Sequence, residues 1–189
     1  MKRTHLITLA AALSLSACAN LGGADNLGPS LKASEMSSLG KSQTSPIIDA
    51  TGKKIGLATI TQGNRGVVTS VMLGELTPGK HGMHFHAIGD CSPDSFKSAM
   101  GHVMPSGNPH GFLNPMGPHE GNLPNLYVMA NGIAQAETYN TMVSLHGAYG
   151  TPALLDEDGS ALIIHENPDD HSSQPIGGSG GRVACAVFK

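Results

Sequence analysis

The sequence predicts an all-β domain, a sandwich or Greek-key barrel. Two observations predict this fold. Short runs of β-branched and apolar residues alternate with turn residues, and no stretch shows a convincing period of 3.6 residues. The chain of 189 residues also contains 25 Gly and 12 Pro, and both residue types interrupt helices. Its length suits one domain of ordinary size plus an extra segment.

Seven runs have the composition of strands, and turn residues separate them. They span residues 46–48, 55–61, 67–73, 126–130, 133–137, 161–165 and 183–188. Asn131-Gly132, between the fourth run and the fifth, is the strongest short hairpin signal. Two long stretches rich in Gly, Pro and polar residues, 89–124 and 166–181, interrupt the strands. Loops of that length usually carry function.

The charge of the chain excludes two classes of protein. Lys and Arg number 11 against 14 Asp and Glu, so there is no basic excess for binding nucleic acid. Charged residues make up 13% of the chain, whereas ~25% is usual, which argues against a disordered acidic or basic protein. We therefore expect a globular protein with no nucleic-acid partner.

The first residues resemble a bacterial export signal. Lys2 and Arg3 precede an apolar run, 6–13, that is too short to span a bilayer, which needs ~20 apolar residues. The run ends in Leu-Ser-Ala-Cys at 15–18, which resembles a lipobox, the pattern in which the signal is removed and Cys18 receives lipid. The alternative is an ordinary signal peptide with a coincidental Cys18.

The domain organisation follows from this signal. We expect a signal peptide at 1–17, a lipidated Cys18 with a flexible Gly/Ser/Asn-rich tether at 18–40, and a folded domain at 41–189. The protein would then be an exported, membrane-anchored lipoprotein that faces the periplasm or the cell exterior. If Cys18 is acylated, Cys91 and Cys185 remain, in a compartment where disulfides persist.

Histidines form the most informative pattern. His84 and His86 are two residues apart, so in a strand both rings point to one face and can reach one ion. A His-x-His pair by itself is more often a coincidental exposed pair. Here four more histidines follow in or beside the long loops: His102, His110, His119 and His165. Imidazole ligands suit copper and zinc, so the six residues predict a metal centre.

Five stretches, in this order, resemble the copper/zinc superoxide dismutases. They are HGMHFHAIGDC at 81–91, SAMGH at 98–102 followed by His110-Gly111, GPHEGNLPNL at 117–126, IHENPDDH at 164–171 and GGSGGRVAC at 177–185. The resemblance covers roughly residues 41–189. It implies a Greek-key β-barrel of about eight strands with long metal-binding and electrostatic loops.

The resemblance also implies a role for individual residues. Copper would be held by His84, His86, His102 and His165, and zinc by His102, His110, His119 and the residue at position 122. His102 would bridge both metals and donate a proton, and Arg182 would dock the superoxide anion. Asp169 would accept hydrogen bonds from His84 and His110. Cys91 and Cys185 would form a disulfide, which closes a loop of about 95 residues and contributes up to ~4–5 kcal/mol.

The sequence departs from the family pattern at several positions. Asn122 stands where the family has a zinc-binding Asp, and a neutral amide is a poorer ligand for a dication. Three histidines can hold zinc with a water, so we expect copper to be retained and zinc to be weakly bound or absent. Met100 stands where Gly is usual, and Val103-Met104 replaces an aromatic-polar pair. The stretch 166–181 has no Lys or Arg, which leaves Arg182 and the copper ion to steer the substrate, with Lys80 and Lys97 as further candidates.

These patterns predict copper-dependent dismutation of superoxide to oxygen and hydrogen peroxide at the cell envelope. The alternative is a non-catalytic copper-binding or copper-buffering lipoprotein with the same fold, which the altered zinc loop and the missing positive charges motivate. Arg182 argues against that alternative, because a binder would not need it. A zinc hydrolase is a weaker interpretation, since no general base is evident.

The sequence leaves open whether the protein is a monomer or a homodimer. His81 is expected to be a structural hydrogen-bonding residue, and His146 and His171 to be solvated.

Overall fold

The computed structural model describes residues 37–189, so the predicted signal peptide, Cys18 and most of the tether lie outside the described residues. The described part forms nine β-strands and two short 3-10 helices, which confirms the all-β prediction. The strands are β1 (Ser42–Asp49), β2 (Lys54–Gly63), β3 (Gly66–Leu73), β4 (Gly79–His81), β5 (Met83–His86), β6 (Leu126–Val128), β7 (Ala134–Asn140), β8 (Ser160–His165) and β9 (Arg182–Phe188). The helices are η1 (Lys97–Ala99) and η2 (Ala148–Gly150). Between residues 37 and 189, no helix has the length and apolar character needed to cross a membrane.

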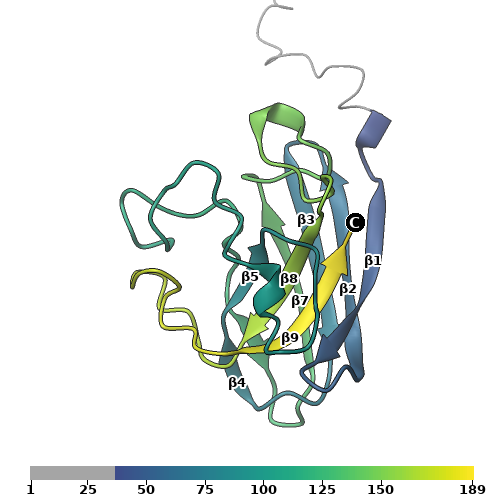
Figure 1. Ribbon diagram of the computed structural model, residues 1–189, viewed down its shortest axis with the longest axis vertical. Helices are drawn as coiled ribbons and strands as arrows, with labels where there is room; N and C mark the ends of the chain where they lie inside the picture. Colours follow the sequence, from purple (N-terminus) through teal and green to yellow (C-terminus); the bar gives the residue numbers. More distant parts are fainter. Residues whose placement is uncertain (1–36) are drawn as a thin grey trace, which may run out of the picture. The chain divides into compact units, whose positions relative to one another are not determined.

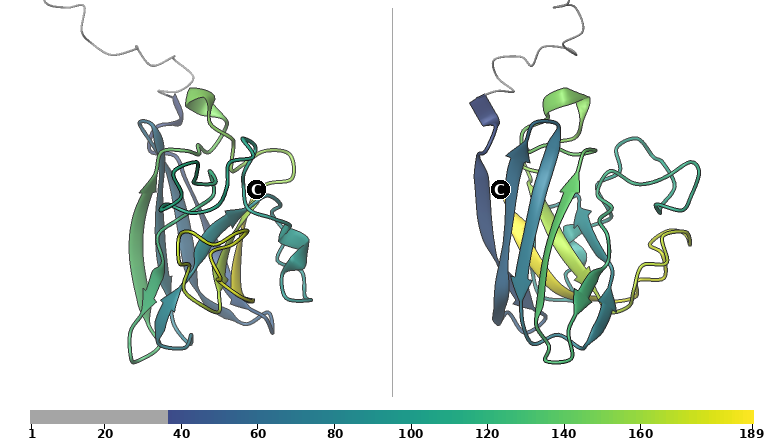
Figure 2. Two further views of the ribbon diagram at one scale, coloured as in Figure 1. Left: turned by 90° about the vertical axis from the view of Figure 1, so that its left-hand side faces the viewer. Right: turned by 180° about the vertical axis from the view of Figure 1, so that it is seen from behind.

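The strands form an antiparallel barrel (Figures 1 and 2). Seven strands make one sheet in the order β5-β8-β9-β1-β2-β3-β7, and β4 pairs with β6 in a two-stranded ribbon. Only Gly82 separates β4 from the edge strand β5, and a short turn joins β6 to β7 at the opposite edge. The ribbon therefore links the two edges of the curled sheet, so that neither edge is left as a long unprotected strand.

The turn at Asn131-Gly132 is present, but its flanking strands do not pair with each other. The amide of Gly132 donates to the carbonyl of Met129, and the amide of Met129 donates to the carbonyl of Ile133, both at 2.9 Å. β6 pairs with β4, whereas β7 pairs with β3 along its whole length. The hairpin prediction is thus right for the turn and wrong for the pairing. Seven residues of β7 satisfy more backbone groups against β3 than they could against the three residues of β6.

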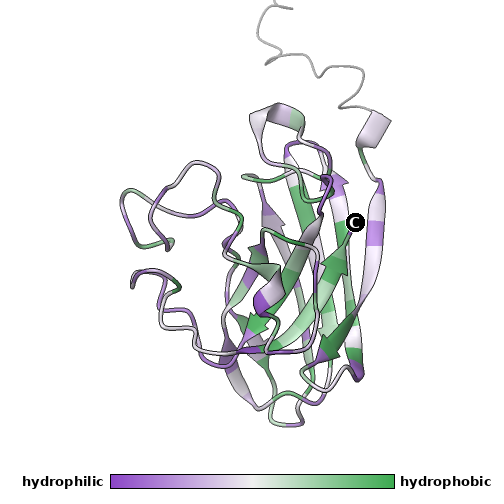
Figure 3. Ribbon diagram, viewed as in Figure 1, coloured by the Kyte–Doolittle hydropathy of each residue, from purple (hydrophilic) through white to green (hydrophobic). Residues whose placement is uncertain are grey.

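β5 and β8 lie side by side and each has two buried faces. Phe85 and Leu162 pair with each other and point into the barrel core, as do Met83 and Ile164. Apolar residues concentrate along the strands in this way (Figure 3). The alternate residues of both strands point outward, and these include His84, His86 and His165. The side-chain period of two therefore places three of the predicted copper ligands on one outer face of the sheet.

Two long loops cover this outer face, which explains why all six residues of β8 are buried. Residues 87–125 and 166–181 lie on the same side of the barrel in both views of Figure 2. The first loop runs beside the edge strand β5, where Phe85 donates to the carbonyl of Gly121 and accepts from the amide of Val103. A Cβ at Gly121 would clash with the Phe85 carbonyl, so this close approach requires glycine.

A disulfide fastens the first loop to the barrel. Cys91 and Cys185 are bonded, with their Cα atoms 5.8 Å apart and a sequence separation of 94. Cys185 belongs to a small second core beneath the loop, which contains Phe96, Ala99 and Ile163. The predicted disulfide is confirmed, and it fixes the stretch of loop that leads to His102.

Candidate metal centre

Four imidazole rings converge on the outer face of β5 and β8. His84 and His86 come from β5, His165 ends β8, and His102 comes from the covering loop. One nitrogen of each ring lies within 4.8 Å of the others, and every ring is at most 5% exposed. A single ion can contact all four nitrogens.

Each of these rings has one engaged nitrogen. Nε2 of His84 is 2.7 Å from Oδ2 of Asp169, and Nδ1 of His86 donates to the carbonyl of Met100 at 2.8 Å. Nδ1 of His165 is 3.3 Å from the carbonyl of Gly180, and Nδ1 of His102 is 3.0 Å from Nδ1 of His119. These contacts orient the rings and set which nitrogen carries the proton.

The other four nitrogens are buried and have no hydrogen-bond partner: Nδ1 of His84 and Nε2 of His86, His102 and His165. Leaving a buried polar atom unsatisfied costs ~1–3 kcal/mol, and here four such atoms point into one small volume. A bound cation relieves all four penalties at once. The residues present therefore fit a copper ion.

Burial also sets the protonation state that a ligand needs. Desolvation lowers the pKa of His86 and of His102 well below the ordinary value, and the positive charge of neighbouring imidazoles lowers the pKa of His102 further. Desolvation likewise lowers the pKa of His165 to about 3. The rings are therefore neutral at physiological pH, with lone pairs available for a metal.

A second histidine cluster adjoins the first. One nitrogen each of His102, His110 and His119 lies within 4.8 Å of the others, so His102 belongs to both clusters. Asn122 is 2% exposed and closes this cluster, with Nδ2 at 3.2 Å from Nδ1 of His110. Oδ1 of Asn122 is buried without a partner. Three imidazoles and a free amide oxygen fit a zinc ion, but the set contains no anionic ligand.

One carboxylate joins the two clusters. Oδ2 of Asp169 accepts from His84, and Oδ1 lies 3.0 Å from Nε2 of His110. Burial raises the pKa of Asp169, but hydrogen bonds from His110 and His84 outweigh it and hold the pKa below the ordinary value. Asn125 anchors the backbone of Asp169 through two hydrogen bonds of 2.8 Å. Gly177 has φ +62°, and a Cβ there would overlap the carboxylate.

A cavity of about 460 Å³ leads to the four-histidine cluster. Its lining includes His86, His102, His165, Met104 and Arg182. Arg182 begins β9, and its two terminal nitrogens donate to the carbonyl of Phe96 at 2.6 Å and the carbonyl of Met100 at 2.5 Å. These bonds fix a permanent positive charge at the wall of the cavity.

Comparison with known proteins agrees with this geometry. A family model described as copper/zinc superoxide dismutase matches residues 54–188. The chain belongs to this family. A copper/zinc superoxide dismutase of Caulobacter vibrioides is 50% identical over 149 residues, which cover 78% of this chain and 86% of that protein.

Two solved structures share the fold of this chain. A superoxide-dismutase-like protein from Bacillus subtilis has a TM-score of 0.73 at 36% identity and covers 77% of this chain and 97% of its own. The copper/zinc superoxide dismutase from Brucella abortus has a TM-score of 0.64 at 29% identity and covers 79% and 100%. The predicted family and the predicted barrel are confirmed.

Met100 has a backbone conformation that is costly for a residue other than glycine. Its φ of 61° and ψ of −148° lie in a region that glycine adopts freely and that other residues occupy at a cost of ~1–3 kcal/mol. The residue is 59% exposed, while its carbonyl accepts hydrogen bonds from both His86 and Arg182. One carbonyl thus positions a candidate copper ligand and the guanidinium.

The two lysines considered for substrate steering do not line the cavity. Lys97 is exposed beside Asp94, with 3.5 Å between its Nζ and the Asp94 carboxylate, and Lys80 lies in β4. Among the residues that line the 460 Å³ cavity, Arg182 is the only lysine or arginine. The permanent positive charge of the cavity lining is therefore concentrated on this one side chain.

Some supporting residues were missed by sequence reasoning. His171, expected to be solvated, is only 23% exposed along its side chain, and its Nε2 is 3.2 Å from Nδ2 of Asn125. Gln174 exchanges two 2.9 Å hydrogen bonds with the backbone of His110. The available signal for a supporting role of His171 was its position two residues after Asp169. His81 is structural as expected, with Nδ1 at 2.7 Å from the carbonyl of His165.

Proposed function

We propose that this protein dismutates superoxide at the copper site formed by His84, His86, His102 and His165. The convergence of four unpaired buried nitrogens carries this proposal. Bound copper would supply the redox chemistry, taking an electron from one superoxide and giving it to a second. In balance, two superoxide anions and two protons give oxygen and hydrogen peroxide.

Arg182 would dock the anion. A guanidinium has five N–H donors, and the hydrogen bonds to Phe96 and Met100 engage two of them. The remaining donors can meet an anion in the cavity at no cost of reorganisation, because the side chain is already held.

His102 would carry a proton for the product. Its Nε2 has no partner, and the ring lines the 460 Å³ cavity. When this nitrogen is not bound to the metal, a proton held on it can pass to the peroxide, while the contact between Nδ1 and His119 keeps the ring in place.

We expect Arg182→Ala to lower the dismutation rate constant about tenfold or more at unchanged copper content, because a charge-assisted hydrogen bond contributes ~1.5–3 kcal/mol. Arg182→Lys keeps the charge and should retain more of the rate. Arg65→Ala removes the same charge from the turn between β2 and β3 and is the matched control. The measurement is superoxide decay by pulse radiolysis on copper-loaded protein.

The same assay separates the enzyme from the copper-buffering alternative. A copper-loaded wild-type protein that binds one copper and does not accelerate superoxide decay would favour the buffer. Equal rates for the wild type and Arg182→Ala would contradict the role of Arg182.

We propose that the zinc site is weak. Asn122 occupies the fourth ligand position with a neutral amide, and its Nδ2 faces His110. Asn122→Asp should raise zinc affinity about tenfold or more, since contacts of a charged group contribute ~1.5–3 kcal/mol. Competition titration with a zinc chelator measures this change. An unchanged affinity would refute the proposed effect of Asn122.

We propose that the protein is exported and anchored by lipid at Cys18. The basic start, the short apolar run and Cys18 support the anchor, and the disulfide fits an exported protein. Cys18→Ser should move the protein from the membrane fraction to the soluble fraction, as followed by immunoblotting. Wild-type protein that is already soluble and carries no lipid mass would contradict the anchor.

A further inference from the structure

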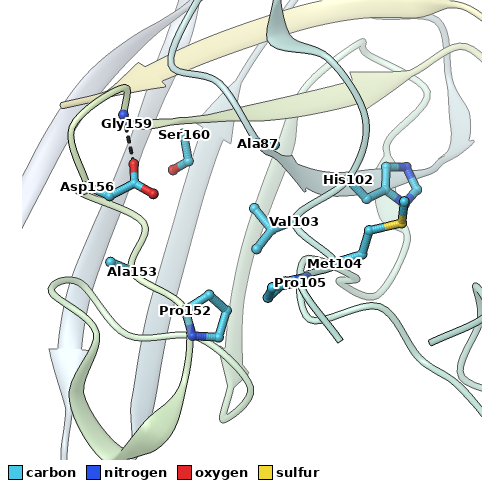
Figure 4. Close-up of a pocket in the computed structure, with 10 residues that line it drawn as sticks. All are labelled: Ala87, His102, Val103, Met104, Pro105, Pro152, Ala153, Asp156, Gly159 and Ser160. Atoms are coloured by element: carbon cyan, nitrogen blue, oxygen red, sulfur yellow. Dashed lines mark hydrogen bonds between the residues drawn. The ribbon is translucent and has the colours of Figure 1, made fainter. Parts of the chain in front are cut away.

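A second cavity lies beside the segment that carries His102 (Figure 4). Its volume is about 320 Å³, and His102 and Met104 line both cavities. Its walls are mostly apolar: Val103 and Pro105 lie on one side, and Pro152 and Ala153 face them. This hollow has room for a short hydrocarbon group.

Two oxygen atoms mark one end of this cavity. Ser160 is 1% exposed, and its hydroxyl is buried without a hydrogen-bond partner. Oδ1 of Asp156 accepts the amide of Gly159 at 2.9 Å. Figure 4 shows the second carboxylate oxygen of Asp156 and the Ser160 hydroxyl turned toward the same end of the cavity. A group with several N–H donors can satisfy both oxygens at once.

The charge at this end favours a cation. Glu157 and Asp158 follow Asp156 in the same exposed turn, and neither Lys nor Arg lines the cavity. The stem of Lys189 packs beside Gly159, but Lys189 is not a lining residue. Burial and the charge of Asp158 raise the pKa of Asp156, which a bound cation would counteract.

We propose that this cavity binds a primary alkylammonium group, carried by a small amine or by a lysine side chain of another molecule. The alkyl part would lie between Val103 and Pro152, and the ammonium would donate to Asp156 and Ser160. A divalent metal ion fits less well, because one carboxylate and apolar walls do not provide its oxygen shell. The proposal is independent of the copper chemistry.

The test is a titration of n-butylamine into the mature copper(I)-loaded protein, which is diamagnetic. The methyl resonances of Ala87 and Ala153, both lining residues, report occupancy. We expect saturable shifts with n-butylamine and at least tenfold weaker binding of n-butanol, which has the same alkyl body without the charge. Nα-acetyl-lysine amide tests whether the ammonium group of a lysine side chain binds in the cavity. If it binds as well as n-butylamine, a lysine side chain is a sufficient ligand; if only n-butylamine binds, the ligand is a small amine.

Three variants locate the site. Asp156→Asn keeps an oxygen for the amide of Gly159 and should weaken binding about tenfold or more, as expected for loss of a charged acceptor. Ser160→Ala removes a hydroxyl that has no partner, so the fold is preserved, and it should weaken binding about fivefold. Glu157→Gln removes the same charge from the same turn without touching the cavity, and it should leave binding within about twofold.

Several results would overturn the proposal. They are the absence of saturable shifts, equal binding of n-butanol, and an equal loss in Glu157→Gln and Asp156→Asn, which would indicate general electrostatic attraction. Displacement of n-butylamine by stoichiometric calcium chloride would also overturn it, in favour of a divalent-cation site.

Discussion

The burial of unpaired imidazole nitrogens is the constraint on which the rest of this structure depends. Four such atoms at one point are unfavourable in a folded protein, because each has lost the hydrogen bond to water that it would make when exposed. The fold concentrates them by simple means. The period of two in β5 and β8 sends apolar side chains inward and histidines outward, and two loops then exclude water from that outer face. A cation is the natural partner for such a site, and membership of the copper/zinc superoxide dismutase family indicates that this cation is copper.

The Asp169 carboxylate makes the two histidine clusters one unit. It contacts a ring of each cluster, so a shift of either ring changes the hydrogen bonds available to the other. Asn125 holds its backbone, and Gly177 allows the loop to approach it closely. Met100 couples a second pair of groups, because its carbonyl holds both His86 and Arg182. The electrostatic environment of the substrate and the orientation of a candidate ligand are therefore linked through short contacts.

Much of the site was predictable from the sequence because its signals are local or carried by motifs. The His84-x-His86 spacing, the apolar run that ends at His165 and the two long loops all correspond to features of the fold. The pairing of β6 with β4 was not predictable, since a turn motif specifies its own geometry and not the partner of each flanking strand. The partial burial of His171, the positive φ of Met100 and the cavity beside Ser160 depend on contacts between distant segments, and no local pattern reports them.

The most direct test of the account is a crystal structure of the copper-loaded protein, with anomalous scattering recorded at the copper edge. The account predicts one strong copper peak bonded to Nδ1 of His84 and to Nε2 of His86 and His165, with Nε2 of His102 as the fourth ligand in the oxidised state. A copper peak at another place, or one that leaves the His84, His86 and His165 nitrogens unbound, would contradict it.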